Sequence, residues 1–420
     1  MSCRVDWIPL GDLVHFESGG TPSKKFQTYW NGNIPWISAK TLIGDSVATS
    51  NLCITSEGLK AGSRLARGGS LLLLTRGSGL FKRIPLAMTA KDVAYNQDIK
   101  CLTSKRANIS NRYIFFALRS LEPNIVAMLE TTGIGAGKLS TDRLKTLRVP
   151  VLDSESRLKV ERFFEAVFQK IALNTKLNGY LEELCECLAA HESGTKTEIM
   201  QLCSLVSEKV PCNEAVLNTY VSTESLLSDK RGRQRASSLP RTGKVTVYRS
   251  SDVLISNIRP YFKKIWFADC DGTCSGDVLV FRAKNPLLAP YLYSILHADS
   301  FFEFVMKGAK GTKMPRGDKR QMLTYQAASS PRQDTIASTT ILTEQIAIND
   351  RENDKLTALR DVILPKLMSG EIDVSKIDFT QLNSHLVQRD SVRSKPVDDV
   401  FLDQSFSLRA GANICSFTCR

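Results

Sequence analysis

The sequence has little that would place it in or across a membrane. Its longest purely aliphatic stretch is Leu71–Leu74, whereas a membrane-spanning helix needs about 20 apolar residues. Residues 1–7 lack the apolar segment of a signal peptide. We therefore expect a cytoplasmic protein that makes no membrane contact.

Metal-binding and redox patterns are also absent. The eleven cysteines include no CxxC pair, and the four histidines are widely scattered. Cys270 and Cys274 are four residues apart, but no second pair accompanies them at zinc-site spacing. We expect free thiols and no metal site.

Catalytic motifs are missing as well. The chain has no GxSxG or HExxH sequence. The stretch from Gly133 to Lys138 resembles a phosphate-binding loop, but Thr132 replaces the required first glycine and Leu139 the required Ser or Thr. We expect no catalytic residue and no cofactor bound by this chain.

Positive charge is in excess, with 56 basic and 43 acidic residues and a net charge of +13. Residues 60–91 and 230–249 each carry seven basic residues and no acidic one, and residues 307–320 carry six against Asp318 alone. A single run of this kind is usually a solvated face. Three runs favour phosphate contacts with nucleic acid.

The chain also contains an internal repeat. Residues 171–184 and 346–359 are identical at six of fourteen positions with a constant offset of 175, and both copies have the pattern Ile-Ala-x-Asn-x-x-x-Asn. Weaker similarity extends upstream, where residues 111–118 resemble 289–296, residues 70–76 resemble 252–257, and residues 133–138 lie opposite 308–313. Each half thus has a variable strand-rich segment, a Gly/Lys loop and a long helix.

Heptad spacing predicts amphipathic helices over residues 154–191 and about 331–364, with Pro365 ending or kinking the second. If the helices pair antiparallel, their asparagines can meet and fix the register. The alternative is that each helix packs on its own domain and leaves these asparagines exposed. The residues predicted to pair the helices are Ile171, Asn174, Asn178, Leu181, Ile346, Asn349, Asn353 and Leu356.

Both remaining segments alternate short strand-like runs with Gly, Pro and Asn, so the fold class is mixed α/β with a pseudo-two-fold internal repeat. Two β-rich domains would be separated by two long antiparallel helices that form a coiled coil. The predicted boundaries are 1–150 for the first domain, 151–193 for the central helix, 194–328 for the second domain, 329–372 for the C-terminal helix and 373–420 for a disordered tail.

Several motifs resemble one known family. Residues 18–22 (Ser-Gly-Gly-Thr-Pro) followed by Tyr29-Trp30-Asn-Gly-Asn-Ile-Pro-Trp36, and residues 252–260 in the second half, look like parts of target-recognition domains in specificity subunits of type I restriction–modification enzymes. The two Asn-containing helices and residues 364–372 look like the central regions of that family. The resemblance covers about residues 5–375.

This resemblance implies that each domain reads one half of a bipartite, asymmetric site on double-stranded DNA. The helices would set the spacing and dock two modification (methyltransferase) subunits, and restriction (translocase and nuclease) subunits would join them. S-adenosylmethionine, ATP and Mg²⁺ would be bound by those partners. The candidate DNA-binding residues are Lys24, Lys25, Tyr29, Lys40, Arg64, Arg67, Arg76, Lys82, Arg83, Lys138, Lys230, Arg231, Arg233, Arg235, Arg241, Arg249, Arg259, Lys263, Lys264, Lys310, Lys313 and Arg316.

Two other hypotheses remain open from the sequence. A self-contained DNA methyltransferase or nuclease with unrecognised motifs would modify or cleave DNA alone. A duplicated coiled-coil adaptor would have no salt-sensitive affinity for DNA.

Overall fold

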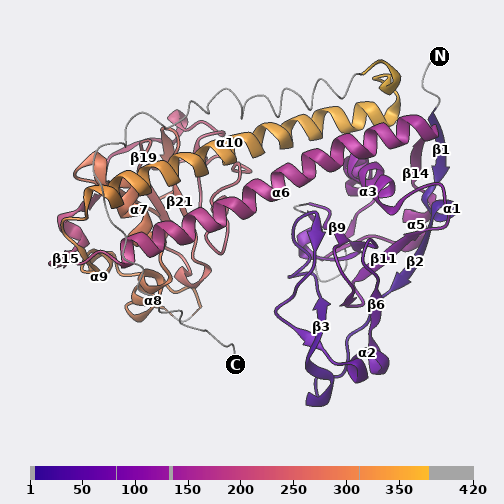
Figure 1. Ribbon diagram of the computed structural model, residues 1–420, viewed down its shortest axis with the longest axis horizontal. Coiled ribbons are helices and arrows are strands. Elements are labelled where there is room, and N and C mark those ends of the chain that lie inside the picture. The colour runs from indigo at the N-terminus through magenta and orange to yellow at the C-terminus, as the bar shows by residue number, and fades with distance from the viewer. Residues whose placement is uncertain (1–4, 82, 132–135, 312, 378–420) are drawn as a thin grey trace, which may run out of the picture. The chain divides into compact units, whose positions relative to one another are not determined.

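A computed structural model describes residues 5–81, 83–131, 136–311 and 313–377 (Figure 1). The chain folds into two compact units. Of the described residues, those up to 164 and those from 363 to 377 belong to unit 1, and those from 165 to 362 belong to unit 2.

Unit 1 is built mainly from short strands. Its strands are β1 (Val5–Pro9), β2 (Val14–Ser18), β3 (Trp30–Ile37), β4 (Ser46–Val47), β5 (Cys53–Ile54), β6 (Arg64–Ala66), β7 (Leu71–Leu74), β8 (Arg76–Gly77), β9 (Leu86–Thr89), β10 (Val93–Tyr95), β11 (Ile99–Ser104), β12 (Glu130–Thr131), β13 (Gly137–Lys138) and β14 (Arg148–Leu152). Its short helices are α1 (Leu10–Leu13), η1 (Gln27–Tyr29), α2 (Ser56–Gly62), η2 (Ser78–Phe81), α3 (Asn111–Ser120), α4 (Glu122–Ala127) and α5 (Thr141–Thr146).

Two larger sheets of unit 1 have the strand orders β2-β11-β7-β9-β4 and β5-β3-β10-β6. All four leucines of β7 are buried, because this central strand is covered on both faces and therefore reads as a continuous apolar run. Trp36, near the C-terminal end of β3, is 6% exposed, as expected for a core residue.

Unit 2 has fewer strands. They are β15 (Lys196–Glu198), β16 (Cys203–Leu205), β17 (Lys209–Pro211), β18 (Tyr220–Val221), β19 (Lys244–Tyr248), β20 (Val253–Ser256), β21 (Ile265–Phe267), β22 (Gly272–Cys274), β23 (Val278–Ala283) and β24 (Gln326–Ala328). Its short helices are η3 (Ile199–Gln201), η4 (Cys212–Glu214), η5 (Pro260–Phe262), η6 (Pro286–Leu288), α7 (Ala289–His297), α8 (Asp299–Lys307) and α9 (Lys319–Leu323).

Unit 2 repeats most of the strand pairings of unit 1. Its antiparallel sheet β16-β23-β20-β21 corresponds to β2-β11-β7-β9. In its other sheet, β22 pairs parallel with β18 and antiparallel with β19, as β10 does with β3 and β6. The two-stranded pair β15-β24 likewise corresponds to β1-β14.

Each of these two-stranded pairs is followed by one 37-residue helix, α6 (Ser154–Ala190) after β14 and α10 (Gln333–Ser369) after β24. The first matches the predicted span of 154–191. The second begins at Gln333 and continues through Pro365 to Ser369, so of the two alternatives predicted for this proline, a helix end is wrong and a kink stays a prediction.

Beyond α10, the last described element is the turn η7 (Val374–Lys376), in which Val374 is buried. Residues 378–420, which make up most of the predicted tail, lie outside the described residues. The mixed α/β fold class with an internal repeat is confirmed. Among the described residues, no helix is both long and apolar enough to cross a membrane.

Candidate DNA interface and helix pair

The asparagines predicted to pair α6 with α10 meet in unit 2. We call the line of residues along which the two helices face each other the seam. Asn174 Nδ2 donates to Asn353 Oδ1 over 3.0 Å, and Asn349 Nδ2 donates to Asn178 Oδ1 over 2.7 Å. The contacts run in opposite directions along the two helices, so residues 165–190 and 333–362 pair antiparallel, as Figure 1 shows. The alternative in which these asparagines are exposed does not hold, because Asn174, Asn178 and Asn349 are buried.

Apolar seam residues flank the asparagines. Ile346 and Leu356 are buried, and Ile171 and Leu181 are half-buried. An antiparallel pair with polar residues at the centre of an apolar seam fixes one register, because a slip would leave buried amides unpaired.

Charged side chains add to the contacts between the two helices. Lys170 Nζ lies 3.3 Å from Glu352 Oε2, which also accepts a hydrogen bond from Asn174. Near the N-terminus of α10, Glu192 has a fully buried side chain that accepts hydrogen bonds from the Arg332 backbone N–H (3.2 Å) and the Thr335 hydroxyl. The Thr335 and Arg332 hydrogen bonds lower the pKa of Glu192 and outweigh its partial desolvation. This carboxylate therefore caps the N-terminus of α10.

Helix α7 of unit 2 is bound to α6 by a cluster of polar side chains. Tyr293 Oη donates to Glu182 over 3.2 Å, and His297 Nδ1 lies 2.6 Å from Glu186. Lys230 Nζ lies 2.8 Å from the same Glu186 oxygen. Burial raises the pKa of Glu186, but the hydrogen bonds from His297 and Lys230 outweigh it, so the net shift is downward.

The candidate DNA-binding residues of unit 1 lie mostly at the surface. Lys24, Lys25, Lys40, Arg64, Arg67, Arg76 and Arg83 are exposed, and Tyr29 and Lys138 are half-buried. Arg67 pairs with Asp92 at 2.6 Å, and Arg83 donates to the Gly44 carbonyl over 3.4 Å. Lys82 lies outside the described residues.

The candidates of unit 2 divide into two groups. The exposed group is Arg231, Arg235, Arg241, Arg249, Lys310, Lys313 and Arg316. The other group is half-buried and consists of Lys230, Arg233, Arg259, Lys263 and Lys264.

Most of the half-buried group makes internal contacts. The guanidinium of Arg233 lies 4.4 Å from the ring centre of Trp266, Lys264 donates to the Thr223 carbonyl, and Lys263 pairs with Asp299 at 2.9 Å. These side chains hold the unit together, so the exposed group is the better source of contacts with a ligand.

Each unit places some of its basic residues on an equivalent ribbon of three short segments. In unit 1, β12 pairs with β13, which pairs with β8, so that Lys138 lies beside Arg76. In unit 2, Lys310 bridges Arg316, which bridges Ile258. The structure therefore makes Arg316 the counterpart of Lys138, whereas the repeat offset of 175 residues predicts Lys313 as the counterpart.

No group of three or more His, Cys, Asp or Glu side chains in the described part of the chain could hold a metal ion. The eight cysteines in that part are free thiols. Two exposed aromatic side chains, Tyr261 and Phe262, were not predicted as site residues. Their position directly after the basic segment Arg259-Pro260 was the available signal.

Residues 5–183 match the family described as the type I restriction modification DNA specificity domain. This segment covers most of unit 1 and the larger part of α6. The resemblance to type I specificity subunits that the sequence motifs indicated is therefore confirmed over these residues.

Two characterised relatives agree with this match. The specificity subunit of the type I restriction enzyme EcoR124I/EcoR124II from Escherichia coli is 32% identical over 150 residues, which are 35% of this chain and 37% of the relative. The specificity subunit of the type I restriction enzyme MjaIX from Methanocaldococcus jannaschii is 24% identical over 185 residues, 43% of this chain and 42% of the relative. The chain thus spans less than half the length of each relative.

Among solved structures, the type I restriction–modification S subunit from M. genitalium aligns with 87% of this chain and 96% of its own. The sequence identity is 14% and the TM-score is 0.45.

Proposed function

We propose that this chain is the DNA sequence-recognition subunit of a type I restriction–modification complex. One observation carries the proposal: the match to a DNA specificity domain covers most of unit 1, and unit 2 repeats most of the strand pairings of unit 1. Each unit would read one half of a bipartite, asymmetric site in double-stranded DNA. Exposed Lys and Arg side chains on both units suit phosphate contacts, which supply affinity without sequence preference.

The helix pair would set the spacing between the half-sites. A 37-residue helix rises about 55 Å, which is more than one turn of B-DNA at about 34 Å. The asparagine contacts support this role, because they hold the two helices in one register.

The same helix pair would dock the modification subunits. Leu173, Leu177, Tyr180 and Leu184 form a stripe at helical spacing on α6, and each is between 39% and 62% exposed. On α10, Ile348 directly precedes the seam residue Asn349, just as Leu173 precedes Asn174. In an antiparallel pair these equivalent positions lie on one side, so Ile348 would extend the apolar surface formed by the stripe on α6. Surfaces of this kind mark sites of protein association.

Sequence choice would be the contribution of this chain, and catalysis that of its partners. S-adenosylmethionine would be bound by the modification subunits, and ATP and Mg²⁺ would serve the restriction subunits. The complex would act on cellular DNA in the cytoplasm.

The test is to map methylated bases by single-molecule sequencing in cells that carry this chain and its cognate modification subunit. We expect methyl-adenine at a bipartite, gapped motif that disappears when the gene for this chain is deleted. A motif that persists after deletion, or no motif with a modification subunit known to be active, would overturn the proposal. DNA cleavage or methylation by the purified chain alone would favour a self-contained enzyme instead.

The docking surface gives a separate prediction. Leu177→Asp should prevent co-purification of modification subunits, because a charge would be buried in the apolar contact. Leu158→Asp is the matched control, since Leu158 is also an exposed leucine of α6 (56%) but lies in unit 1, outside the stripe. Equal recovery of modification subunits with both variants would exclude this docking surface.

A further inference from the structure

One exposed turn in unit 2 presents two aromatic rings to solvent. The turn is η5, in which Tyr261 is 47% and Phe262 36% exposed. Their ring centres are 4.7 Å apart, and the ring planes meet at 54°. Large aromatic side chains side by side on a surface leave apolar area in water, which is a cost unless a ligand covers it.

The backbone around this turn is strained. Arg259 (φ 51°) and Lys263 (φ 48°) flank η5 in the left-handed region, and the neighbouring Asp229 and Lys230 both have φ of 59°. These are four of the six non-glycine residues with positive φ in the described part of the chain. Such strain persists only where surrounding contacts enforce it, and it gathers at ligand-binding positions.

Contacts on both sides enforce the conformation. The Arg259 N–H donates to the Pro315 carbonyl over 2.7 Å, and the Asp229 N–H donates to the Phe262 carbonyl over 2.8 Å. Asp299 pairs with Lys230 at 2.6 Å and with Lys263 at 2.9 Å. The hydrogen bonds from these two lysines lower the pKa of Asp299 to about 2. The aromatic turn is therefore held rigidly before any ligand arrives.

Basic side chains lie on the segments that contact the turn. Arg316 bridges Ile258 at the start of the turn, and Lys310 bridges Arg316. The side chain of Lys310 is 84% exposed and that of Arg316 55% exposed, although each has an acidic partner at 3.1 Å. Lys313, which lies between Lys310 and Arg316 in the chain, and Arg231, which follows Lys230, are also exposed. Rigid aromatic rings among exposed cations suit a ligand that carries both flat bases and phosphates.

Unit 1 carries the same device at the equivalent position. The turn η2 directly follows β8, as η5 follows the segment that Arg316 bridges, and it ends on Phe81, which is 51% exposed. Arg76 and Lys138 lie side by side on the adjoining strands. An exposed aromatic turn beside a basic ribbon thus occurs twice, once in each repeat.

We propose that Tyr261 and Phe262 in unit 2, and Phe81 in unit 1, are wedges that stack against bases of the half-site read by their own unit. This inference rests on the proposed function, and it names the aromatic residues that would contact the stacked bases of the DNA. The surrounding cations bind phosphates and position the turn. The rings enter beside a base step and partly unstack it, which makes recognition sensitive to how easily that step deforms.

The test uses the chain assembled with its modification subunits and a duplex carrying the motif mapped as above. The fluorescent base analogue 2-aminopurine, placed in one half-site at a time, reports unstacking. We expect increased fluorescence on binding in both half-sites. Tyr261→Ala with Phe262→Ala should remove the increase in the half-site of unit 2 only, and Phe81→Ala should remove it in the other half-site only.

Affinity gives an independent readout. Loss of aromatic stacking should weaken binding by about tenfold or more. Tyr261→Phe should keep wild-type affinity and fluorescence, because the ring is retained. Leu287→Ala, at another exposed apolar residue of unit 2 (71%), should also behave as wild type. Circular dichroism melting of each variant checks that it is folded.

The outcomes separate the two proposals. If the wild-type complex recognises the motif but the double variant binds as tightly with unchanged fluorescence, the wedge is wrong and the recognition function stands. If the double variant instead loses modification subunits while binding DNA normally, the rings contact protein and the wedge is again wrong. Failure of the wild-type complex to bind the motif would overturn both.

Discussion

Units 1 and 2 share a topology but secure their equivalent helices differently. In unit 1, Tyr113 of α3 binds β14, with Oη 3.0 Å from the Pro150 carbonyl. In unit 2, Tyr291 of α7 reaches β24 in the same way, 3.4 Å from the Ala328 carbonyl. This shared contact ties each helix to the strand that leads into a long helix.

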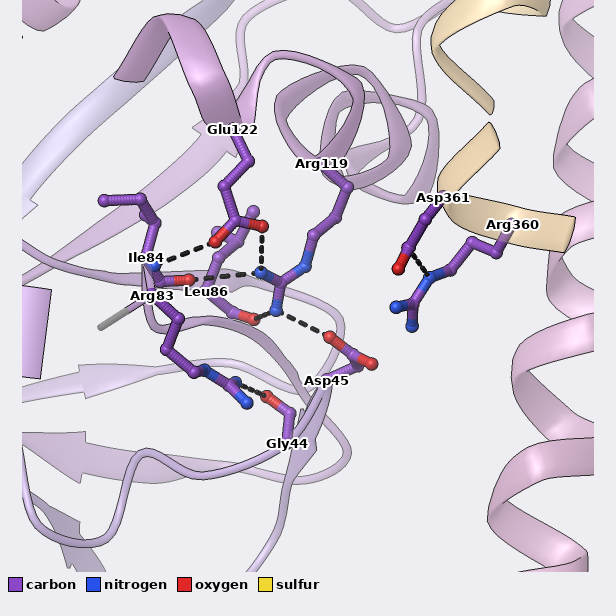
Figure 2. Close-up of polar contacts among 9 residues, drawn as sticks. All are labelled: Gly44, Asp45, Arg83, Ile84, Leu86, Arg119, Glu122, Arg360 and Asp361. Carbon is purple, nitrogen blue, oxygen red and sulfur yellow. Dashed lines mark hydrogen bonds and ion pairs between the residues drawn. The ribbon is translucent and has the colours of Figure 1, made fainter. Parts of the chain in front are cut away.

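The last turns of these two helices differ. Aligned on the shared tyrosine, Arg119 of α3 occupies the position of His297 in α7. Figure 2 shows Arg119 between Asp45, at 2.6 Å, and Glu122, at 3.4 Å, with further bonds to the backbone of the neighbouring strand region. His297 instead contacts glutamates of α6.

The difference teaches which parts of the repeat are scaffold. The sheets and the tyrosine contact are kept in both units. The residue six positions after the tyrosine differs, and Arg119 in unit 1 and His297 in unit 2 contact different neighbours. A permanently charged guanidinium holds loops of unit 1, and an imidazole holds the long helix in unit 2. Loops that differ between the units, such as those before β5 and β19, are where different half-sites can be read without disturbing the scaffold.

The largest effect should come from Arg119→Ala. It would remove the hydrogen bonds that Arg119 donates to Asp45, Glu122 and the Ile84 and Leu86 carbonyl groups, and the Arg119 side chain is only 11% exposed. We expect a loss of about 2–4 kcal/mol in unit 1, below the full cost of a buried pair because the carboxylates are about a third exposed. Hydrogen exchange of β7 amides measures it, with β20 amides in unit 2 as the internal reference.

His297→Ala is the matched variant in unit 2. Its effect should be smaller, because Lys230 still pairs with Glu186 at 2.8 Å. It should appear at β20 and leave β7 unchanged. Equal loss in both units from either variant would contradict the separate roles of these two residues.

A second comparison concerns asparagines that the repeat makes equivalent, Asn178 and Asn353. Asn178 is buried and accepts from buried Asn349, whereas Asn353 is half-buried. Asn178→Leu should therefore cost about 1–3 kcal/mol, because it leaves the Asn349 amide without its acceptor. Asn353→Leu should cost less. Urea unfolding of the full chain measures both variants.

The double variant Asn178→Leu with Asn349→Leu sharpens this test. Replacing both partners by apolar groups should recover most of the lost stability. Register would no longer be fixed by these two residues, so the motif mapped in cells should tolerate more than one gap length. If neither Asn178→Leu nor Asn349→Leu alone changes the stability, the hydrogen bond between these two asparagines contributes nothing.

Periodicity predicted the helix pair and its asparagine contacts well, because a seam repeats every seven residues and is visible in one sequence. Charge runs predicted individual contacts less well. Lys230, in the basic run 230–249, and Lys263 were both candidate DNA contacts by sequence, but the fold turns both toward Asp299. The aromatic turn was missed because positive φ at Arg259 depends on tertiary contacts rather than on residue type.

The smallest effect concerns Asp350, a carboxyl of the helix pair whose pKa is raised toward neutral pH. Burial, and then the charges of Glu182, Asp354 and Asp269, raise the pKa of Asp350 to about 7. Unit 1 has no counterpart among its described residues. A raised pKa means that the folded state holds this proton more tightly than the unfolded chain, so stability falls as pH rises from about 4 to about 7.

Asp350→Asn should remove this loss while keeping an oxygen that can accept from Asn178, which now lies 2.7 Å away. At pH 8 the variant should be more stable than wild type by less than about 1 kcal/mol, because more than a third of Asp350 is exposed. Near pH 4 the two should melt together. Glu344→Gln neutralises an exposed carboxylate of the same helix and controls for net charge. If the difference in melting temperature between Asp350→Asn and wild type is the same at pH 4 and pH 8, Asp350 does not titrate in this range, and the helix pair is no more pH-sensitive than unit 1.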